Sequence, residues 1–174
     1  SASSYYGEYP KWAYDYDRDS SLVDRIGSVE WTPLNDSVDQ FAYFSERGKK
    51  KPFKHKFNGD RRFVAYKSSA RVNEEVVRFA CYAMEQSHMG EDNLTDMLNV
   101  SLYAGTYEHQ GVSRYGVEMQ DTYARLDRQI STLIRAVEDK VGQGNALFVL
   151  TSTGYTDAED IDDLSQWRIP TGVF

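Results

Sequence analysis

The residues with the clearest capacity for chemistry lie in the second half of the chain. Glu108 and His109 are adjacent, and an acidic cluster follows between Asp157 and Asp163. Carboxylates and imidazoles bind divalent cations, so these residues could together hold a metal ion. Acidic loops are more often simply hydrated, and solvation is therefore the alternative interpretation of the cluster.

A basic run in the first half could bind an anion, or could be a solvated loop. Its members are Lys49, Lys50, Lys51, Lys54, His55 and Lys56, followed by Arg61 and Arg62. The whole chain of 174 residues nevertheless carries a net charge of −7. This balance argues against a nucleic-acid partner, because phosphate neutralisation needs an excess of clustered Lys and Arg.

The remaining reactive side chains are isolated. Cys81 is the single cysteine, which excludes an internal disulfide framework and a zinc site built from several cysteines. It lies in an apolar helical stretch, so we expect a packing thiol. His55 and His88 are isolated in the sequence, and a surface or helix-face position is the default for each. No run of 18 apolar residues exists, so no membrane span is expected.

The elements that must position these groups become regular only after about residue 62. Residues 1–62 are predicted to be an irregular aromatic and basic segment, with one short strand at 28–31. Residues 62–66 read as a strand, and residues 72–89 as a helix with acidic residues in its first turn. Residues 97–104 read as a buried strand.

The longest helix is predicted from an apolar stripe with helical spacing. The stripe consists of Met119, Tyr123, Leu126, Ile130, Leu133, Ile134 and Val137. We assign to the solvent-exposed face of this helix the polar residues from Asp121 to Arg125, together with Glu138 near Lys140. The continuous apolar run 146–151 then predicts a strand that is covered on both faces.

Helices that alternate with strands in this way predict parallel strands joined by a right-handed crossover. Ligands of such folds bind beyond the carboxyl ends of the strands. The loops after Ala104 and after Thr151 should therefore lie side by side, and any chemistry should take place there.

The same two loops and the long helix resemble the alkaline phosphatase superfamily, in particular its bacterial branch with type I phosphodiesterases and nucleotide pyrophosphatases. The matching segments are Thr95-Asp96-Met97-Leu98-Asn99-Val100-Ser101-Leu102, Val117-Glu118-Met119-Gln120-Asp121-Thr122-Tyr123-Ala124-Arg125-Leu126-Asp127 and Gly142-Gln143-Gly144-Asn145-Ala146-Leu147-Phe148-Val149-Leu150-Thr151. The resemblance implies a partial alkaline-phosphatase-like α/β fold, with a parallel β-α-β core over residues 63–154. Residues 1–62 would pack on this core as an irregular or antiparallel part, and residues 155–174 would form an acidic C-terminal loop.

The resemblance also implies where metal ligands should be. The family holds two zinc ions, with an Asp and a His four residues apart after the first strand and an adjacent Asp-His pair after the second. Thr106 and Gln110 stand at the first pair here, and Thr153 and Gly154 at the second. A shift by one residue would bring His109 to a ligand position, and Glu108 is the other neighbouring candidate for rescue.

These losses predict a non-catalytic pseudo-phosphatase domain without a cofactor, which binds an unknown protein or an anionic or glycan ligand. The alternative is a metal-dependent phosphohydrolase or phosphodiesterase with unconventional ligands, or one completed by other chains. A third reading is a glycan- or envelope-binding accessory domain, based on the N-terminal aromatic residues Tyr5, Tyr6, Tyr9, Trp12, Tyr14 and Tyr16. The resemblance implies a periplasmic or cell-surface location.

The predicted parallel core is unusually small. Two or three parallel strands would leave both edges of the sheet bare, which is unfavourable. The alternatives are added antiparallel strands from residues 1–60, pairing of chains into a homo-oligomer, or a longer protein of which this sequence is a part.

Overall fold

The computed structural model describes residues 8, 10–19, 21–34, 45–46, 49–50, 52–110 and 112–152. Its elements in chain order are α1 (Lys11–Asp19), α2 (Leu22–Ser28), β1 (Glu30–Trp31), β2 (Ser45–Glu46), β3 (Lys49–Lys50), β4 (His55–Lys56), α3 (Arg62–Lys67), α4 (Val72–Gln86), the 3₁₀ turn η3 (Tyr107–His109) and α5 (Val112–Val141).

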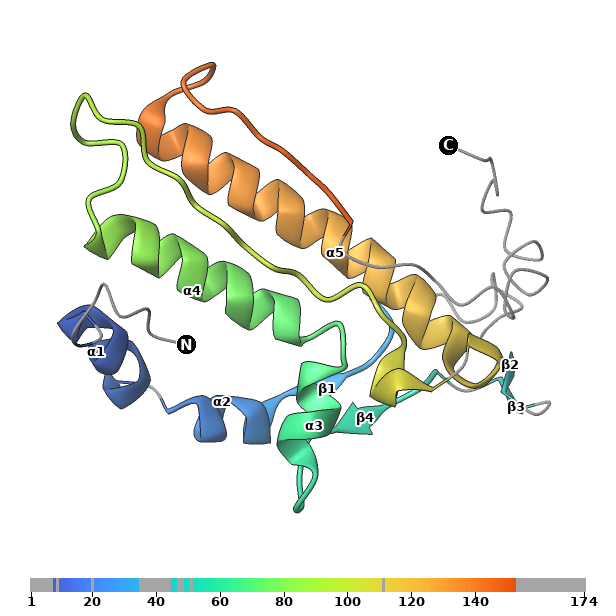
Figure 1. The fold of residues 1–174 in the computed structure, drawn as a ribbon. Helices are drawn as coiled ribbons and strands as arrows, with labels where there is room; N and C mark the ends of the chain where they lie inside the picture. Colours follow the sequence, from blue (N-terminus) through green and yellow to red (C-terminus); the bar gives the residue numbers. More distant parts are fainter. Residues whose placement is uncertain are drawn as a thin grey trace.

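Helices α4 and α5 lie side by side and form the central layer (Figure 1). Helix α4 has Glu74 and Glu75 in its first turn, where carboxylates interact favourably with the helix dipole. Its buried face consists of Asn73, Val77, Ala80 and Met84. The helix predicted over 72–89 is thus confirmed, with its end three residues earlier than expected.

Helix α5 confirms the prediction of one long helix and begins earlier than its apolar stripe. It spans 30 residues and ends where Gly142 adopts a φ of 86°, a left-handed conformation that favours glycine. Lys140 lies in the last turn and makes ion pairs with residues outside the helix. Its ammonium group contacts Glu85 and Glu91 at 3.1 and 3.0 Å.

The hydrophobic core lies at the end of this layer where α4 begins. Its buried residues are Ile26, Trp31, Phe57, Tyr66, Ala70 and Tyr107. They come from α2, β1, the segment after β4, α3, the α3–α4 connection and η3, so the N-terminal segment supplies a large part of the core. Strands β1 and β4 pair antiparallel, with Trp31 opposite His55 and Glu30 opposite Lys56.

Two expectations for the first 66 residues are wrong. Residues 11–28 are not irregular, because they form α1 and α2, and the Ser21 side chain caps α2 by accepting a hydrogen bond from Val23 N at 3.2 Å. The segment 62–66 is not a strand but helix α3. A turn at Gly59, with φ of 76°, leads directly into this helix, and Tyr66 then packs edge-on against Phe57 at 5.2 Å.

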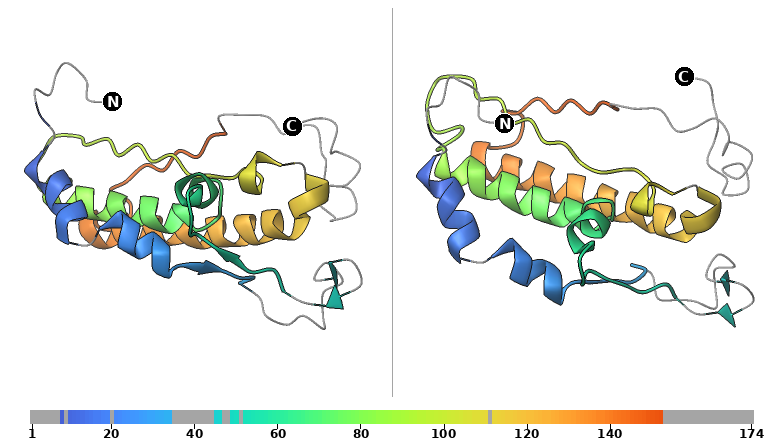
Figure 2. Two further views of the ribbon diagram at one scale, coloured as in Figure 1. Left: turned by 90° about the horizontal axis from the view of Figure 1, so that it is seen from below. Right: turned by 60° about the horizontal axis from the view of Figure 1, so that its bottom comes forward.

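Residues 97–104 and 146–151 are extended, but they form no strand ladder with each other or with any other described residue. Both run in the same direction along the α4–α5 layer (Figure 1). Figure 2 shows them on one side of this layer, with α1 and α2 on the other. The parallel β-α-β core remains a prediction.

The expectation that 146–151 is covered on both faces is wrong for the described part of the chain. Leu147 is 90% exposed and Val149 is 81% exposed, because no described segment lies on their outer side. Among the helices that the structure describes, none is both long and apolar enough to cross a membrane.

Candidate functional site

The loop 104–110 connects the first extended segment to α5 and carries the first pair of predicted degenerate metal positions. Thr106 is half-buried, and its carbonyl oxygen accepts a hydrogen bond from the Tyr103 hydroxyl. Gln110 is exposed, and its main-chain N–H donates to the Tyr107 carbonyl at 3.1 Å. The structure therefore places both positions in one short, internally bonded loop.

Two polar side chains from the α3–α4 junction fix this loop. Asn73 is fully buried, and its amide makes two hydrogen bonds to the main chain of Tyr103: Nδ2 donates to the carbonyl at 2.8 Å, and Oδ1 accepts from the N–H at 2.7 Å. The hydroxyl of buried Ser68 accepts from the N–H of Glu108 at 3.2 Å. Asn73 thus satisfies the main chain of the extended segment where it enters the loop.

Tyr107 anchors the centre of the loop in an aromatic cluster. Its ring centroid lies 5.3 Å from Trp31, 4.4 Å from His55 and 5.1 Å from Tyr115. Burial raises the pKa of its hydroxyl to about 12. With Tyr107 held inward, the chain turns back through two residues of positive φ, Glu108 at 51° and His109 at 56°, a conformation uncommon outside glycine.

His55 belongs to this cluster and lies in strand β4, so its expected surface or helix-face position is wrong. Its side chain is 19% exposed, and Nε2 lies 2.8 Å from a carboxylate oxygen of Glu118, which is 9% exposed. The contact joins β4 to α5. Only the antiparallel pairing of β1 and β4 brings His55 there, and the local sequence around it gives no sign of it.

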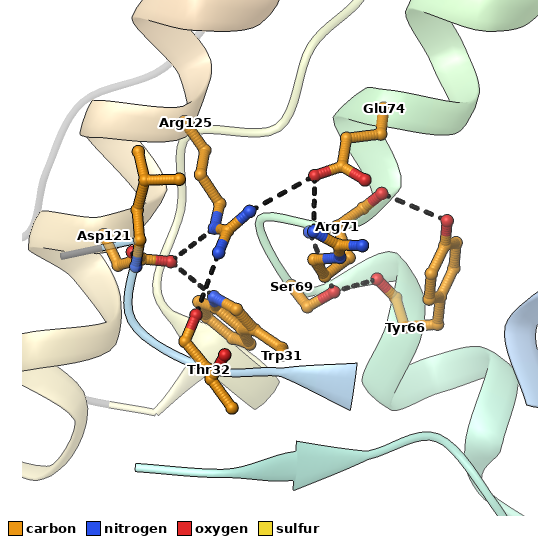
Figure 3. A network of polar contacts seen from close by, with 9 residues as sticks. Trp31, Thr32, Tyr66, Ser69, Arg71, Glu74, Asp121 and Arg125 are labelled. Carbon is orange, nitrogen blue, oxygen red and sulfur yellow. Dashed lines mark hydrogen bonds and ion pairs between the residues drawn. The ribbon is translucent and has the colours of Figure 1, made fainter. Parts of the chain in front are cut away.

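A second buried network joins α5 to β1 and α4 (Figure 3). The Asp121 carboxylate accepts from Trp31 Nε1, from Leu34 N and, at 2.7 Å, from Arg125 Nε. Arg125 also donates to the Thr32 carbonyl at 2.9 Å and lies 3.3 Å from Glu74. The network therefore links residues that are about 90 positions apart in the chain.

Glu74 continues the network to the start of α4. Its Oε1 is 2.7 Å from Arg71, whose carbonyl accepts from the Tyr66 hydroxyl at 3.0 Å (Figure 3). Burial, followed by the charges of Glu75 and Glu74, raises the pKa of Tyr66 to about 12. These contacts give the polar groups of the network a structural role, although the Nε of Arg71 is buried without a hydrogen-bond partner in the described part of the chain.

The assignment of Asp121 and Arg125 to the solvent-exposed face of the long helix is wrong. Each is 8% exposed, and Glu118 and Thr122 beside them are 7% and 1% exposed. A signal for this was present in the sequence, because these four polar residues repeat at the helical spacing of three, one and three. Their residue types alone favour solvent exposure, and the spacing is the feature that indicates burial.

The possible rescue ligands do not form a metal cluster in the described part of the chain. His109 is exposed, and its Nδ1 lies 3.4 Å from the Tyr103 hydroxyl. No group of three His, Cys, Asp or Glu side chains able to hold a metal ion occurs among the residues that the structure describes. Thr153, Gly154 and the acidic cluster 157–163 lie outside the described residues.

The other candidates have ordinary roles. From the basic run, Lys54 and Lys56 are exposed and contact the two oxygens of Glu30 at 2.7 and 3.0 Å. Cys81 is half-buried on α4, and burial raises the pKa of its thiol, which makes it less nucleophilic. His88 is exposed, 2.9 Å from Glu91.

No protein-family model matches the chain, and no solved structure does. Three curated proteins are similar to it. Alkaline phosphatase PafA of Elizabethkingia meningoseptica is 28% identical over 186 residues, which cover 99% of this chain and 34% of that protein. Alkaline phosphatase PhoV of Synechococcus elongatus is 24% identical over 166 residues, covering 87% of this chain and 30% of that protein. A calcium-transporting ATPase of Myroides odoratus is 27% identical over 165 residues, covering 86% of this chain and 30% of that protein.

The similarity to PafA includes the N-terminal residues, for which the sequence alone had given no resemblance. The chain spans about a third of the length of the curated relatives it matches. Two of these relatives are alkaline phosphatases, and their similarity to the chain agrees with the resemblance that the long helix and its flanking loops show to the alkaline phosphatase superfamily.

Proposed function

We propose that this chain is a non-catalytic, pseudo-phosphatase module of the alkaline phosphatase superfamily, with a binding or structural role. The observation that carries the proposal is the chemistry of the loop 104–110. Thr106 and Gln110 stand where the resemblance places an Asp and a His. A neutral hydroxyl and an amide do not supply the carboxylate and imidazole that a zinc site of this kind needs.

The way in which the loop is held also supports the proposal. Asn73, Ser68 and Tyr107 fix its main chain through hydrogen bonds and aromatic packing, with no metal ligand among them. The scaffold around the former site is therefore stable by its own contacts. The motif of the long helix is explained in the same way, since Glu118, Asp121 and Arg125 hold the N-terminal segment against α5.

The alternative is a metal-dependent phosphohydrolase or phosphodiesterase with unconventional ligands, or one completed by other chains. The names of the relatives favour it, because two are alkaline phosphatases and one is an ATPase. The glycan-binding reading is less well supported. Trp12 and Tyr16 of α1 pack against Phe79 and Tyr82 of α4 with centroid distances between 5.0 and 6.2 Å, so they are engaged within the fold.

Hydrolysis of p-nitrophenyl phosphate with added zinc separates the two leading functions, with the Elizabethkingia alkaline phosphatase as the positive control. A non-catalytic module gives the rate of buffer with zinc alone. Zinc-dependent turnover that is lost in Glu108→Gln/His109→Gln would contradict the proposal and support unconventional ligands. A periplasmic or cell-surface location is part of the proposal, and recovery of the chain in the cytoplasmic fraction would contradict it.

A further inference from the structure

An asparagine followed by a glycine, Asn58-Gly59, lies in the turn between strand β4 and helix α3, which projects from the molecule (Figure 1). Both residues are exposed. Gly59 has a φ of 76°, and a Cβ atom added to it would have no residue within 4 Å apart from its chain neighbours. The turn is therefore open to solvent, although Phe57, the residue before it, is only 1% exposed and belongs to the hydrophobic core.

The reactive groups of this pair are not held by other contacts. In the described part of the chain, no hydrogen bond engages the Asn58 side chain or the Gly59 N–H. The nitrogen of a residue that follows asparagine can attack the side-chain amide. Glycine favours this attack, because it has no side chain to obstruct the approach and changes its backbone conformation at little cost.

The other asparagines that the structure describes lack at least one of these conditions. Asn73 is fully buried, and the side chain of Asn145 donates a hydrogen bond to a main-chain carbonyl at 2.8 Å. Asn93 and Asn99 are exposed, but each is followed by a larger aliphatic side chain that crowds the attacking nitrogen. Among the described asparagines, Asn58 is therefore the one most open to this reaction.

We propose that Asn58 is a site of spontaneous deamidation, which changes the main chain at the start of α3 over time. Hydroxide removes the proton of the Gly59 N–H, and this nitrogen attacks Cγ of Asn58. The new N–Cγ bond closes a succinimide ring, and the side-chain nitrogen leaves as ammonia. Water then opens the ring: hydrolysis at the side-chain carbonyl gives aspartate, whereas hydrolysis at the main-chain carbonyl gives isoaspartate, in which the main chain runs through Cβ and Cγ.

The two products differ in their effect on the fold. Isoaspartate adds one carbon atom to the main chain between Phe57 in the core and α3. This helix supplies Tyr66, which packs edge-on against Phe57 at 5.2 Å, and it leads to Ser68, whose hydroxyl accepts a hydrogen bond from the N–H of Glu108. Isoaspartate should therefore loosen the support of the loop 104–110, whereas aspartate only adds a charge at an exposed turn. The proposal goes beyond the proposed function, since it holds whether or not the module is catalytic.

The test follows the full 174-residue chain during incubation in mildly alkaline buffer, which favours loss of the Gly59 N–H proton. Peptide mass spectrometry after brief digestion in acid measures the fraction of Asn58 that has gained about 1 Da. We expect this fraction to grow at least about tenfold faster than at the exposed Asn93. Unfolding in urea should raise the rate at Asn58 less than about tenfold, because the folded turn is already open. Equal rates at the two asparagines, or a larger effect of urea, would overturn the proposal.

Hydrogen exchange in the loop 104–110 measures the structural effect after the isoaspartate form has been separated by chromatography. The isoaspartate form should exchange at least about threefold faster in this loop than the unmodified chain, whereas Asn58→Asp should exchange at the unmodified rate. Asn58→Gln is the matched control, because its longer side chain closes a ring much more slowly, and neither its mass nor its loop exchange should change during incubation. Equal loop exchange in the isoaspartate form and the unmodified chain would also overturn the proposal.

Discussion

Asp121 is the residue whose replacement should destabilise the fold most clearly. Its carboxylate is 8% exposed and accepts hydrogen bonds from Trp31, Leu34 and Arg125. Asp121→Ala removes all three acceptors and leaves the Arg125 guanidinium, also 8% exposed, without its main counter-charge. Breaking a buried ion pair in this way costs about 3–5 kcal/mol.

The expected loss lies at the lower end of that range, because Arg125 keeps its contacts to Glu74 and to the Thr32 carbonyl. We therefore expect Asp121→Ala to reduce the free energy of unfolding by about 3 kcal/mol. Asp121→Asn keeps the shape and one acceptor oxygen, and should lose less. Equilibrium urea unfolding followed by tryptophan fluorescence measures both.

Asp127→Ala is the matched control, since it makes the same change on an exposed position of the same helix. Its effect should stay within about 0.5 kcal/mol. A loss below about 1 kcal/mol for Asp121→Ala, or a loss equal to that of Asp127→Ala, would refute the claim that this network joins α5 to the N-terminal segment.

Three further predictions concern the loop 104–110 and its support. Asn73→Ala should reduce the free energy of unfolding by about 2 kcal/mol, because two main-chain groups of Tyr103 lose their hydrogen-bond partner. It should also speed hydrogen exchange in the loop. Equal exchange in Asn73→Ala and in the exposed control Asn93→Ala would contradict the proposed role of the Asn73 hydrogen bonds. Tyr107→Phe should change the free energy of unfolding by less than about 1 kcal/mol, whereas Tyr107→Ala should reduce it by about 3–5 kcal/mol because the aromatic cluster opens. Chemical denaturation of both variants measures these changes. Equal losses of stability in the two variants would contradict aromatic packing as the interaction that holds Tyr107. Folding raises the pKa of Tyr66 and Tyr107 from 10.0 to about 12, so their contribution to stability is complete below pH 10 and is lost as pH rises toward 12. Burial also raises the pKa of Tyr16 and Tyr103. Tyrosinate absorbance should therefore show a group of late-titrating tyrosines, with Tyr66 and Tyr107 among them, that titrate normally in urea, and titration of all tyrosines near pH 10 in the folded chain would contradict their burial.

The two long helices were predictable because their signals are local. Helix α4 has acidic residues in its first turn and an apolar face, and α5 has an apolar stripe with helical spacing. Helix α3 was not, because Phe63-Val64-Ala65-Tyr66 is a short apolar run for which periodicity does not separate strand from helix. The turn at Gly59 and the contact of Tyr66 with Phe57 favour the helix over a strand. Both involve residues that precede this apolar run in the sequence.

The site was predictable only in part, for a related reason. The resemblance pointed to the loop 104–110 and to Thr106 and Gln110 as the aligned positions, and the structure places these two residues in one short loop. The groups that hold this loop were not identified, because Asn73 and His55 are 30 and 63 residues from their partners. The burial of Asp121 and Arg125 was not predictable from residue type, because charged side chains are usually exposed and this rule fails where charges pair inside a core.

The measurement that tests the central claim most directly is the zinc content of the purified, untagged chain, determined by elemental mass spectrometry after dialysis against zinc-containing buffer. A chain whose zinc-binding positions carry Thr106 and Gln110 should retain less than about a tenth of an equivalent, since structural affinity for zinc comes from its ligand set. One or two tightly held equivalents would contradict the non-catalytic assignment, and loss of that zinc in Glu108→Gln/His109→Gln would place the ligands in the loop.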